Sequence, residues 1–150
     1  MNTIKWILPT LAAVLLLSGC FINIEDDNGI SIGCLNADGP YVSQELDLPT
    51  IDGIRNTSSV EVFIQQGSEQ EVIVDGKEDA IDELELDVQN GIWEIEFDRC
   101  VRDLDEFSIY ITLPTLRYIS NSGSGDIRGE NLFLVEDLEF RVSGSGDVTL

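Results

Sequence analysis

The sequence predicts an all-β domain that contains a parallel β-solenoid, with an antiparallel hairpin in its amino-terminal part. Apolar and polar residues alternate with a period of two through most of the chain after residue 40, as in half-buried strands. In addition, the pentapeptide Ser-Gly-Ser-Gly-Asp at residues 122–126 returns 21 residues later at 143–147. A repeat of this length is typical of solenoid coils, in which small glycine-rich corners let successive turns stack.

The composition excludes several classes of function. The 150 residues contain 29 Asp and Glu, 8 Lys and Arg and no His, which gives a formal charge of −21. Nucleic acid is excluded as a partner, because its binding depends on basic residues that neutralise phosphates. Without His there is no Ser-His or Cys-His catalytic pair and no His-ligated zinc. We therefore expect a single domain that is not an enzyme and holds no cofactor or metal.

The amino terminus predicts export and lipid anchoring. Residues 1–19 combine a cation at Lys5 with an apolar stretch over 6–17, which is too short for a membrane span and typical of a signal peptide. The following Leu-Ser-Gly-Cys at 17–20 resembles the lipobox of bacterial lipoproteins, so we expect acylation at Cys20. Phe21, in place of the aspartate of inner-membrane retention, favours the outer membrane or the cell surface. The expected organisation is a signal peptide (1–19), a tether (20–39) with a short strand around 30–32, and a β-rich head domain (40–150).

Two further cysteines remain for a disulfide. Cys34 and Cys100 form an even pair in an exported chain, where oxidising conditions permit a bridge. Closing the loop of about 66 residues between them would stabilise the fold by about 4 kcal/mol in the chain-entropy model. It would also pin the amino-terminal segment onto the sheet. The alternative is two unpaired buried thiols.

The head domain begins with alternating strands. Alternation predicts strands at 60–64 and 107–113, the second ending before Pro114, which cannot donate to a ladder. A hairpin is predicted over 84–97 around the turn Asn90-Gly91, with inward residues Leu84, Leu86, Val88, Trp93, Ile95 and Phe97. A brief helical turn is expected near 78–84.

The carboxy-terminal third carries the repeat. The residues expected to form its stacked turns are Ser122, Gly123, Ser124, Gly125, Asp126, Ser143, Gly144, Ser145, Gly146 and Asp147. Those expected in the core of the coils are Leu116, Ile119, Leu132, Leu134, Leu138, Phe140 and Val142. A solenoid end without a cap exposes an edge that can pair with another chain. Either the last coil is an incomplete copy, or residues 148–150 form such an edge and self-associate with another molecule.

The ordered set of motifs resembles the bacterial auto-transporter adhesin head-domain family, the GIN-domain lipoproteins. The motifs are Ile-Asp-Gly-Ile at 51–54, the strand at 60–64 with Gln-Gln-Gly after it, Asn-Gly-Ile-Trp-Glu-Ile at 90–95, Tyr-Ile-Thr-Leu-Pro at 110–114 and the two pentapeptides. The resemblance covers residues 48–150, and family members usually carry further pentapeptide coils beyond. It implies a right-handed parallel β-helix and a cell-envelope lipoprotein active in adhesion, with no catalytic residues to carry over.

Specific residues bear on calcium binding, catalysis and sugar binding. Asp126 and Asp147 miss the phase of the calcium-binding nonapeptide roll by one residue, so we expect them to bond backbone amides in the corner. The alternative to a binding module is a calcium-dependent or carbohydrate-active envelope protein. The second of these would use the acidic residues near Arg99 and Arg102: Asp98, Asp103, Asp105 and Glu106. Four aromatic residues are candidates for stacking on sugars, although we expect core packing: Tyr41, Phe63, Tyr110 and Tyr118. The expected partners are the membrane, through the lipid, and an extracellular glycan or protein ligand.

Overall fold

The computed structural model of this chain describes residues 33–131 and 137–150. The predicted signal peptide, Cys20, the strand expected around 30–32 and two expected core residues, Leu132 and Leu134, lie outside the described residues. Within the described residues the fold is all-β apart from one short helix, which confirms the predicted class. No helix in these two ranges is long and apolar enough to cross a membrane.

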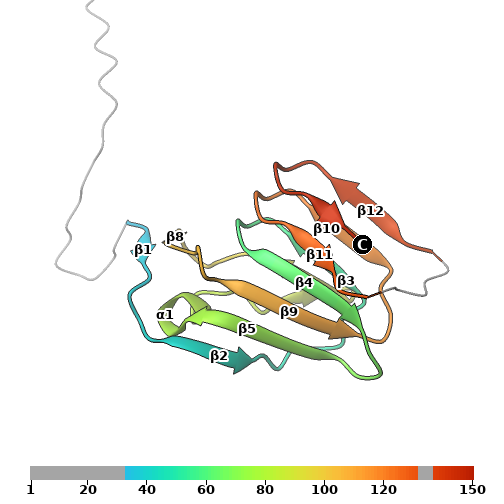
Figure 1. The fold of residues 1–150 in the computed structure, drawn as a ribbon, viewed down its shortest axis with the longest axis horizontal. Helices are drawn as coiled ribbons and strands as arrows, with labels where there is room; N and C mark the ends of the chain where they lie inside the picture. The colour runs from blue at the N-terminus through green and yellow to red at the C-terminus, as the bar shows by residue number, and fades with distance from the viewer. Residues whose placement is uncertain (1–32, 132–136) are drawn as a thin grey trace, which may run out of the picture. The chain divides into compact units, whose positions relative to one another are not determined.

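The largest sheet has six strands in the order β13-β11-β4-β9-β5-β2. The bounds of these strands are β2 Tyr41–Glu45, β4 Glu61–Gln66, β5 Glu71–Lys77, β9 Ser108–Leu113, β11 Ile127–Gly129 and β13 Val148–Thr149. Strands β13, β11, β4 and β9 pair in parallel, whereas β5 and β2 join antiparallel at one edge. Figure 1 shows β5, β9 and β4 lying side by side in this sheet.

A second sheet has five strands in the order β12-β10-β3-β7-β6. The bounds are β3 Gly53–Asn56, β6 Val88–Gln89, β7 Ile92–Ile95, β10 Tyr118–Asn121 and β12 Glu139–Val142. All of its pairs are parallel except β6 with β7. The short helix α1, Glu78–Ile81, directly follows β5, and the remaining strands β1 (Leu35–Asn36) and β8 (Val101–Arg102) pair with each other.

One hydrophobic core joins residues of the two larger sheets. Their inward residues are fully buried because the alternation puts every second side chain on the inner face. From the six-stranded sheet come Val62, Ile64, Val72, Val74, Ile109 and Ile111, and from the five-stranded sheet Ile54, Trp93, Ile95 and Ile119. The alternation predicted at 60–64 and 107–113 is therefore confirmed, as is burial of Leu116 and Ile119.

The repeated pentapeptides stack on one another at the corner between the two sheets. The backbone amide of Ser124 donates to Ser58 O at 3.0 Å, and Ser145 one layer further donates to Gly123 O at 3.0 Å. A Cβ added at Gly125 would lie 1.9 Å from Val60 O, and one at Gly146 would lie 2.0 Å from Gly125 O. Only glycine lets the layers approach closely enough for the backbone ladder to continue through the corner.

The predicted hairpin is confirmed in its turn and pairing. Asn90 and Gly91 have positive φ angles of 54° and 78°, as a tight two-residue turn requires. Leu84 pairs with Phe97 in an antiparallel bridge, and α1 lies within the segment expected to form a helical turn. Leu86 was predicted to be buried, but it is 45% exposed. It lies in the segment that leads into β6, the edge strand of the five-stranded sheet, and no described strand packs beyond that edge.

Two core predictions in β12 are also wrong. Phe140 and Val142 are 48% and 46% exposed, although each aligns with an inward residue of β10, Ile119 or Asn121. Their side chains thus share the inner face, but β12 is the last strand of its sheet in the described residues, so nothing there covers them. Leu138 is half-buried. Self-association through this edge stays a prediction.

Candidate functional site

A disulfide joins Cys34 to Cys100, with 4.5 Å between their Cα atoms. The chain continues from each cysteine directly into one strand of the parallel pair β1–β8, where Leu35 aligns with Val101. The Leu35 amide also donates to Cys100 O at 2.8 Å. The bridge and the strand pair together hold the two following segments, which begin at Ala37 and Asp103.

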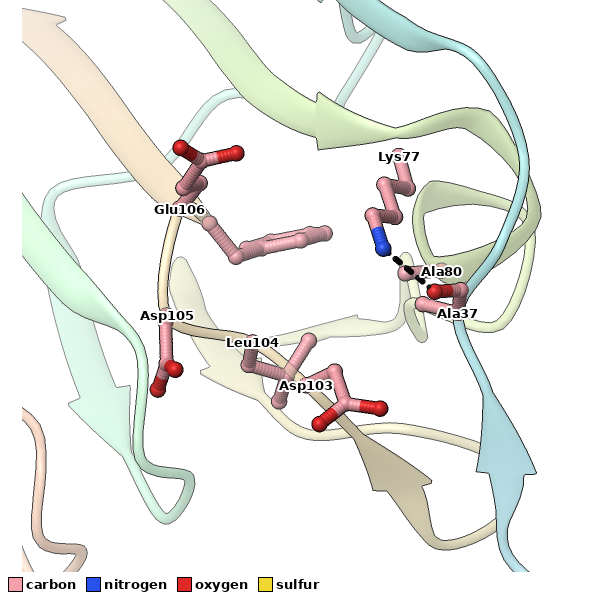
Figure 2. Close-up of a pocket in the computed structure, with 8 residues that line it drawn as sticks. Ala37, Lys77, Ala80, Asp103, Leu104, Asp105 and Glu106 are labelled. Atoms are coloured by element: carbon pink, nitrogen blue, oxygen red, sulfur yellow. Dashed lines mark hydrogen bonds between the residues drawn. The ribbon is translucent and has the colours of Figure 1, made fainter.

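Those two segments form opposite walls of a surface pocket of about 270 Å³. The pocket is lined by Ala37, Lys77, Ala80 and residues 103–107. Figure 2 shows Lys77 and Ala80 facing the segment that carries Leu104, Asp105 and Glu106. The lining therefore combines four apolar side chains, one ammonium group and three carboxylates.

Lys77 is positioned by the end of β5. Val72, Val74 and Gly76 of this strand point into the core, so Lys77 emerges on the opposite face, half-buried. Its Nζ donates to Ala37 O at 2.6 Å, which links β5 to the wall after β1. Asp79 of α1 fixes the same wall, because its Oδ2 accepts from the Asp38 amide at 2.9 Å. This hydrogen bond is the main reason that the pKa of Asp79 lies below its usual value.

Packing of Phe107 against β5 holds the opposite wall, residues 103–107, in place. A Cβ at Gly76 would lie 2.6 Å from the Phe107 ring, so glycine is required for the ring to pack against β5. Phe107 is 3% exposed and meets Phe97 edge to face, with ring centroids 5.5 Å apart. Asp103, at the other end of the segment, has a φ of 61°, a left-handed conformation that is uncommon outside glycine. Such conformations cluster at functional sites.

Tyr41 lies beside the pocket, because it aligns with Lys77 between β2 and β5. The residue is 54% exposed. Burial of the hydroxyl is the largest cause that raises the pKa of Tyr41, followed by the negative charges of Asp75 and Glu106. The surroundings of the pocket are therefore electronegative.

The structure brings the repeat aspartates together in the stacked corner. Oδ1 of Asp126 accepts from the Asp147 amide at 2.9 Å, and Oδ2 accepts from Arg128 at 2.9 Å. The first of these hydrogen bonds, then the second, lowers the pKa of Asp126. The predicted bond from an aspartate to a nearby backbone amide is thus confirmed for Asp126. Among the described residues no three Asp, Glu or Cys side chains are grouped as a metal site would need.

The four aromatic candidates have different environments. Tyr118 is 6% exposed, which confirms core packing, whereas Tyr41 and Tyr110 are 54% and 42% exposed, so core packing is wrong for them. Phe63 and Tyr110 stack on each other with centroids 5.0 Å apart, and the Arg128 guanidinium lies 5.9 Å from the Phe63 ring centre. Both faces of Phe63 are used within the protein, which leaves little ring face for a sugar.

The acidic residues considered for an enzyme separate into two environments. Asp103, Asp105 and Glu106 line the pocket, whereas Asp98 lies beside Glu85, where it contributes to the raised pKa of that residue after burial. Arg99 forms an ion pair with Glu83. Sequence reasoning missed Ala37, Lys77 and Ala80 as pocket residues. The available signal was that Lys77 is one of only two lysines in the sequence, the other being Lys5.

Comparisons with known proteins identify the fold and the family. A "putative adhesin" from Bacteroides fragilis superposes with a TM-score of 0.70 at 20% identity, covering 76% of this chain and 54% of that one. A "putative lipid binding protein" from Parabacteroides distasonis gives 0.69 at 20% identity, covering 79% and 52%. A "putative adhesin" from Parabacteroides merdae gives 0.65 at 13% identity, covering 72% and 46%. The chain thus spans about half the length of these solved structures.

No curated protein matches the sequence. Residues 51–150 match the family described as "Putative auto-transporter adhesin, head GIN domain", which confirms the resemblance drawn from the motifs. The family and its structural neighbours indicate the cell surface or envelope as the location, and none of these neighbours has an enzymatic name. Since the match covers most of the domain described above, the chain belongs to the auto-transporter adhesin head GIN domain family.

Proposed function

We propose that the protein is a lipid-anchored module of the bacterial cell envelope that binds an extracellular ligand and does not catalyse a reaction. The family supports adhesion, and the predicted signal peptide and lipobox support attachment of the mature chain through Cys20. Two or more acyl chains hold a protein at a bilayer far more firmly than one. On this proposal the tether that follows Cys20 presents the head domain to the surroundings, and the end of the expected tether, residues 33–39, is part of the folded domain.

The observation that carries the proposal is the pocket between the segments that follow Cys34 and Cys100. It is open to solvent, mixes apolar and charged groups, and is built on strands whose relative positions are fixed by a disulfide and a ladder. Pockets with an apolar lining and a few convergent polar groups are typical binding sites. A rigid scaffold lowers the entropic cost of binding, because little has to be ordered when the ligand arrives.

We also propose that the parallel part of the domain winds as a right-handed β-helix. Both sheets contain four parallel strands in matching order: β9-β4-β11-β13 in one and β7-β3-β10-β12 in the other. Each pass of the chain from β3 to β4, from β10 to β11 or from β12 to β13 moves from one sheet to the other. The stacked glycine corners lie on the last two of these passes, which supports successive coils. The antiparallel strands β5, β2 and β6 lie at the other edge of the two sheets.

The function is tested in cells of the native organism with the full chain. We expect metabolic acyl labelling of the wild-type protein, accessibility to external protease, and adhesion of the cells to a surface of host glycans and matrix proteins. Cys20→Ala should abolish labelling and release the protein, and adhesion should fall with it. An unlabelled protein in the soluble fraction would overturn lipid anchoring. Turnover of any glycan by the purified protein would overturn the non-catalytic role.

A further inference from the structure

We propose that the Lys77 pocket binds a sugar that carries an acetamido group, with the amide carbonyl accepting a hydrogen bond from Lys77 and the methyl group lying on the apolar wall. The inference rests on the proposed function in that the pocket serves a binding module, and it names the ligand class. The argument depends on the donors of Lys77, the charge around them and the shape of the site.

The ammonium group of Lys77 has donors to spare. A lysine carries three N–H donors. In the part of the chain that the structure describes, Lys77 makes a single hydrogen bond, to Ala37 O at 2.6 Å, and its nitrogen faces the pocket. The remaining donors favour a ligand that presents a hydrogen-bond acceptor at this point. A cationic ligand group is disfavoured beside Lys77 by like-charge repulsion.

The negative charge around the pocket favours a neutral hydrogen-bond acceptor over an anionic one. Asp103, Asp105 and Glu106 line the same pocket, in a chain with a formal charge of −21. An anionic ligand, such as a carboxylate or a phosphate, would approach against this field. A neutral acceptor avoids that repulsion. The three carboxylates are themselves strong acceptors, so they suit the hydroxyl donors of a sugar.

The apolar part of the lining favours a ligand that carries a methyl group next to its hydrogen-bond acceptor. Ala37, Ala80, Leu104 and Phe107 line the pocket together with Lys77. Figure 2 shows Ala37 and Ala80 beside Lys77, and Leu104 on the other side of the pocket. An acetamido group places a carbonyl and a methyl on adjacent bonds, so one group can use both surfaces. The volume of about 270 Å³ is just below the usual lower bound of about 300 Å³ for small-molecule sites. It therefore suits one sugar unit at the end of a glycan and not a longer segment.

The chain offers a direct reporter, because Lys77 is its only lysine besides Lys5 of the predicted signal peptide. The purified mature protein is treated with an amine-reactive succinimidyl ester, and modification of Lys77 is followed by mass spectrometry. N-acetylglucosamine is the probe and glucose, which lacks the acetamido group, is the matched control. We expect saturating N-acetylglucosamine to slow modification of Lys77 about tenfold, as a hydrogen bond to a charged group implies, and glucose to leave the rate unchanged.

Variants test the same contact by calorimetry. Lys77→Met keeps the aliphatic stem and removes the donors, so affinity for N-acetylglucosamine should fall about tenfold or more. Glu71→Gln, which removes a charge from an exposed residue at the other end of β5 and outside the pocket lining, should bind as the wild type does, and a thermal melt establishes that each variant is folded.

Three results would overturn the inference: no protection of Lys77, equal protection by glucose, or unchanged affinity in a folded Lys77→Met variant. Failure of the proposed function is recognised separately. If cells bearing Lys77→Met still adhere, the adhesion module stands and the pocket is not its ligand site. If wild-type cells do not adhere although Lys77 is protected by the sugar, the pocket stands and adhesion fails.

Discussion

Replacing Gly125 by alanine should destabilise the domain strongly, because the stacked corner has no room for a side chain. The added Cβ would lie 1.9 Å from Val60 O, whereas real Cβ contacts essentially never fall below 3.0 Å. The two layers must therefore separate by about 1 Å. Gly125 N donates to Ser58 O at 3.2 Å, and Ser124 N donates to the same oxygen at 3.0 Å. Both hydrogen bonds would exceed hydrogen-bonding distance after such a shift.

The expected loss follows from these two effects. Each hydrogen bond contributes about 1 kcal/mol net, and overpacking against backbone costs about 1–3 kcal/mol. Gly125→Ala should thus lower the free energy of unfolding by about 3 kcal/mol or more. For a domain of this size, about 4 °C of melting temperature corresponds to each kcal/mol, so the expected fall is about 12 °C.

The assay is urea and thermal unfolding followed by circular dichroism, with two comparison variants. Ser124→Ala changes an exposed residue in the middle of the same corner and should stay within about 0.5 kcal/mol of the wild type. Gly146→Ala introduces the same clash one layer further, 2.0 Å from Gly125 O, but no described strand packs beyond that layer. The outer layer can move away from its neighbour, so the loss of unfolding free energy should lie between those of the other two variants. A Gly125→Ala protein as stable as Ser124→Ala would refute the steric account of the repeat.

Three further predictions concern the disulfide and the polar corner residues. Reducing the Cys34–Cys100 bridge should lower the free energy of unfolding by about 4 kcal/mol and shift the urea midpoint; an unchanged midpoint would contradict this. Asn56→Ala should destabilise the domain by about 2 kcal/mol more than Asn121→Ala in the same assay. Among the described residues, the Asn56 side chain takes part in three hydrogen bonds and that of Asn121 in one, with its Oδ1 left without a partner there. Equal losses of stability would contradict this. Asp126→Asn should lower the melting temperature at pH 7. Because the folded-state pKa of Asp126 is lowered, its contribution to stability is present above the unfolded value of about 4 and is lost as the pH falls through the folded value. A difference from the wild type that does not shrink as the pH is lowered would refute the assignment.

The hairpin and the corner could be predicted from sequence because the information is local. Asn90-Gly91 sets its own turn, and the flanking alternation sets the faces of the two strands. The pentapeptides reveal their stacking through their spacing alone. Burial of Phe140 and Val142 could not be predicted, because the pattern fixes which face a side chain takes but not whether another strand covers that face.

The pocket could not be predicted because three separate segments build it. Ala37, Lys77, Ala80 and residues 103–107 come together only through the disulfide, the β1–β8 pair and the place of β5 in its sheet. The left-handed backbone of Asp103 leaves no mark in the sequence, since aspartate is common in ordinary loops as well. The one feature of the sequence that could have indicated the pocket is Lys77, the single lysine of a strongly acidic domain.

The last strand pairs in the two sheets have the same separation in sequence, so further strands can be added to the domain in equal steps. Ile119 aligns with Phe140 in one sheet and Ile127 aligns with Val148 in the other, and both pairs are separated by 21 residues. Duplicating one such segment in the gene would add one strand to each sheet and lengthen the stack by about 4.8 Å. The Lys77 pocket lies by β5 and α1, toward the opposite edge of the six-stranded sheet, and would not be disturbed. Evolution can therefore adjust the length of this domain in fixed steps while the pocket keeps its shape.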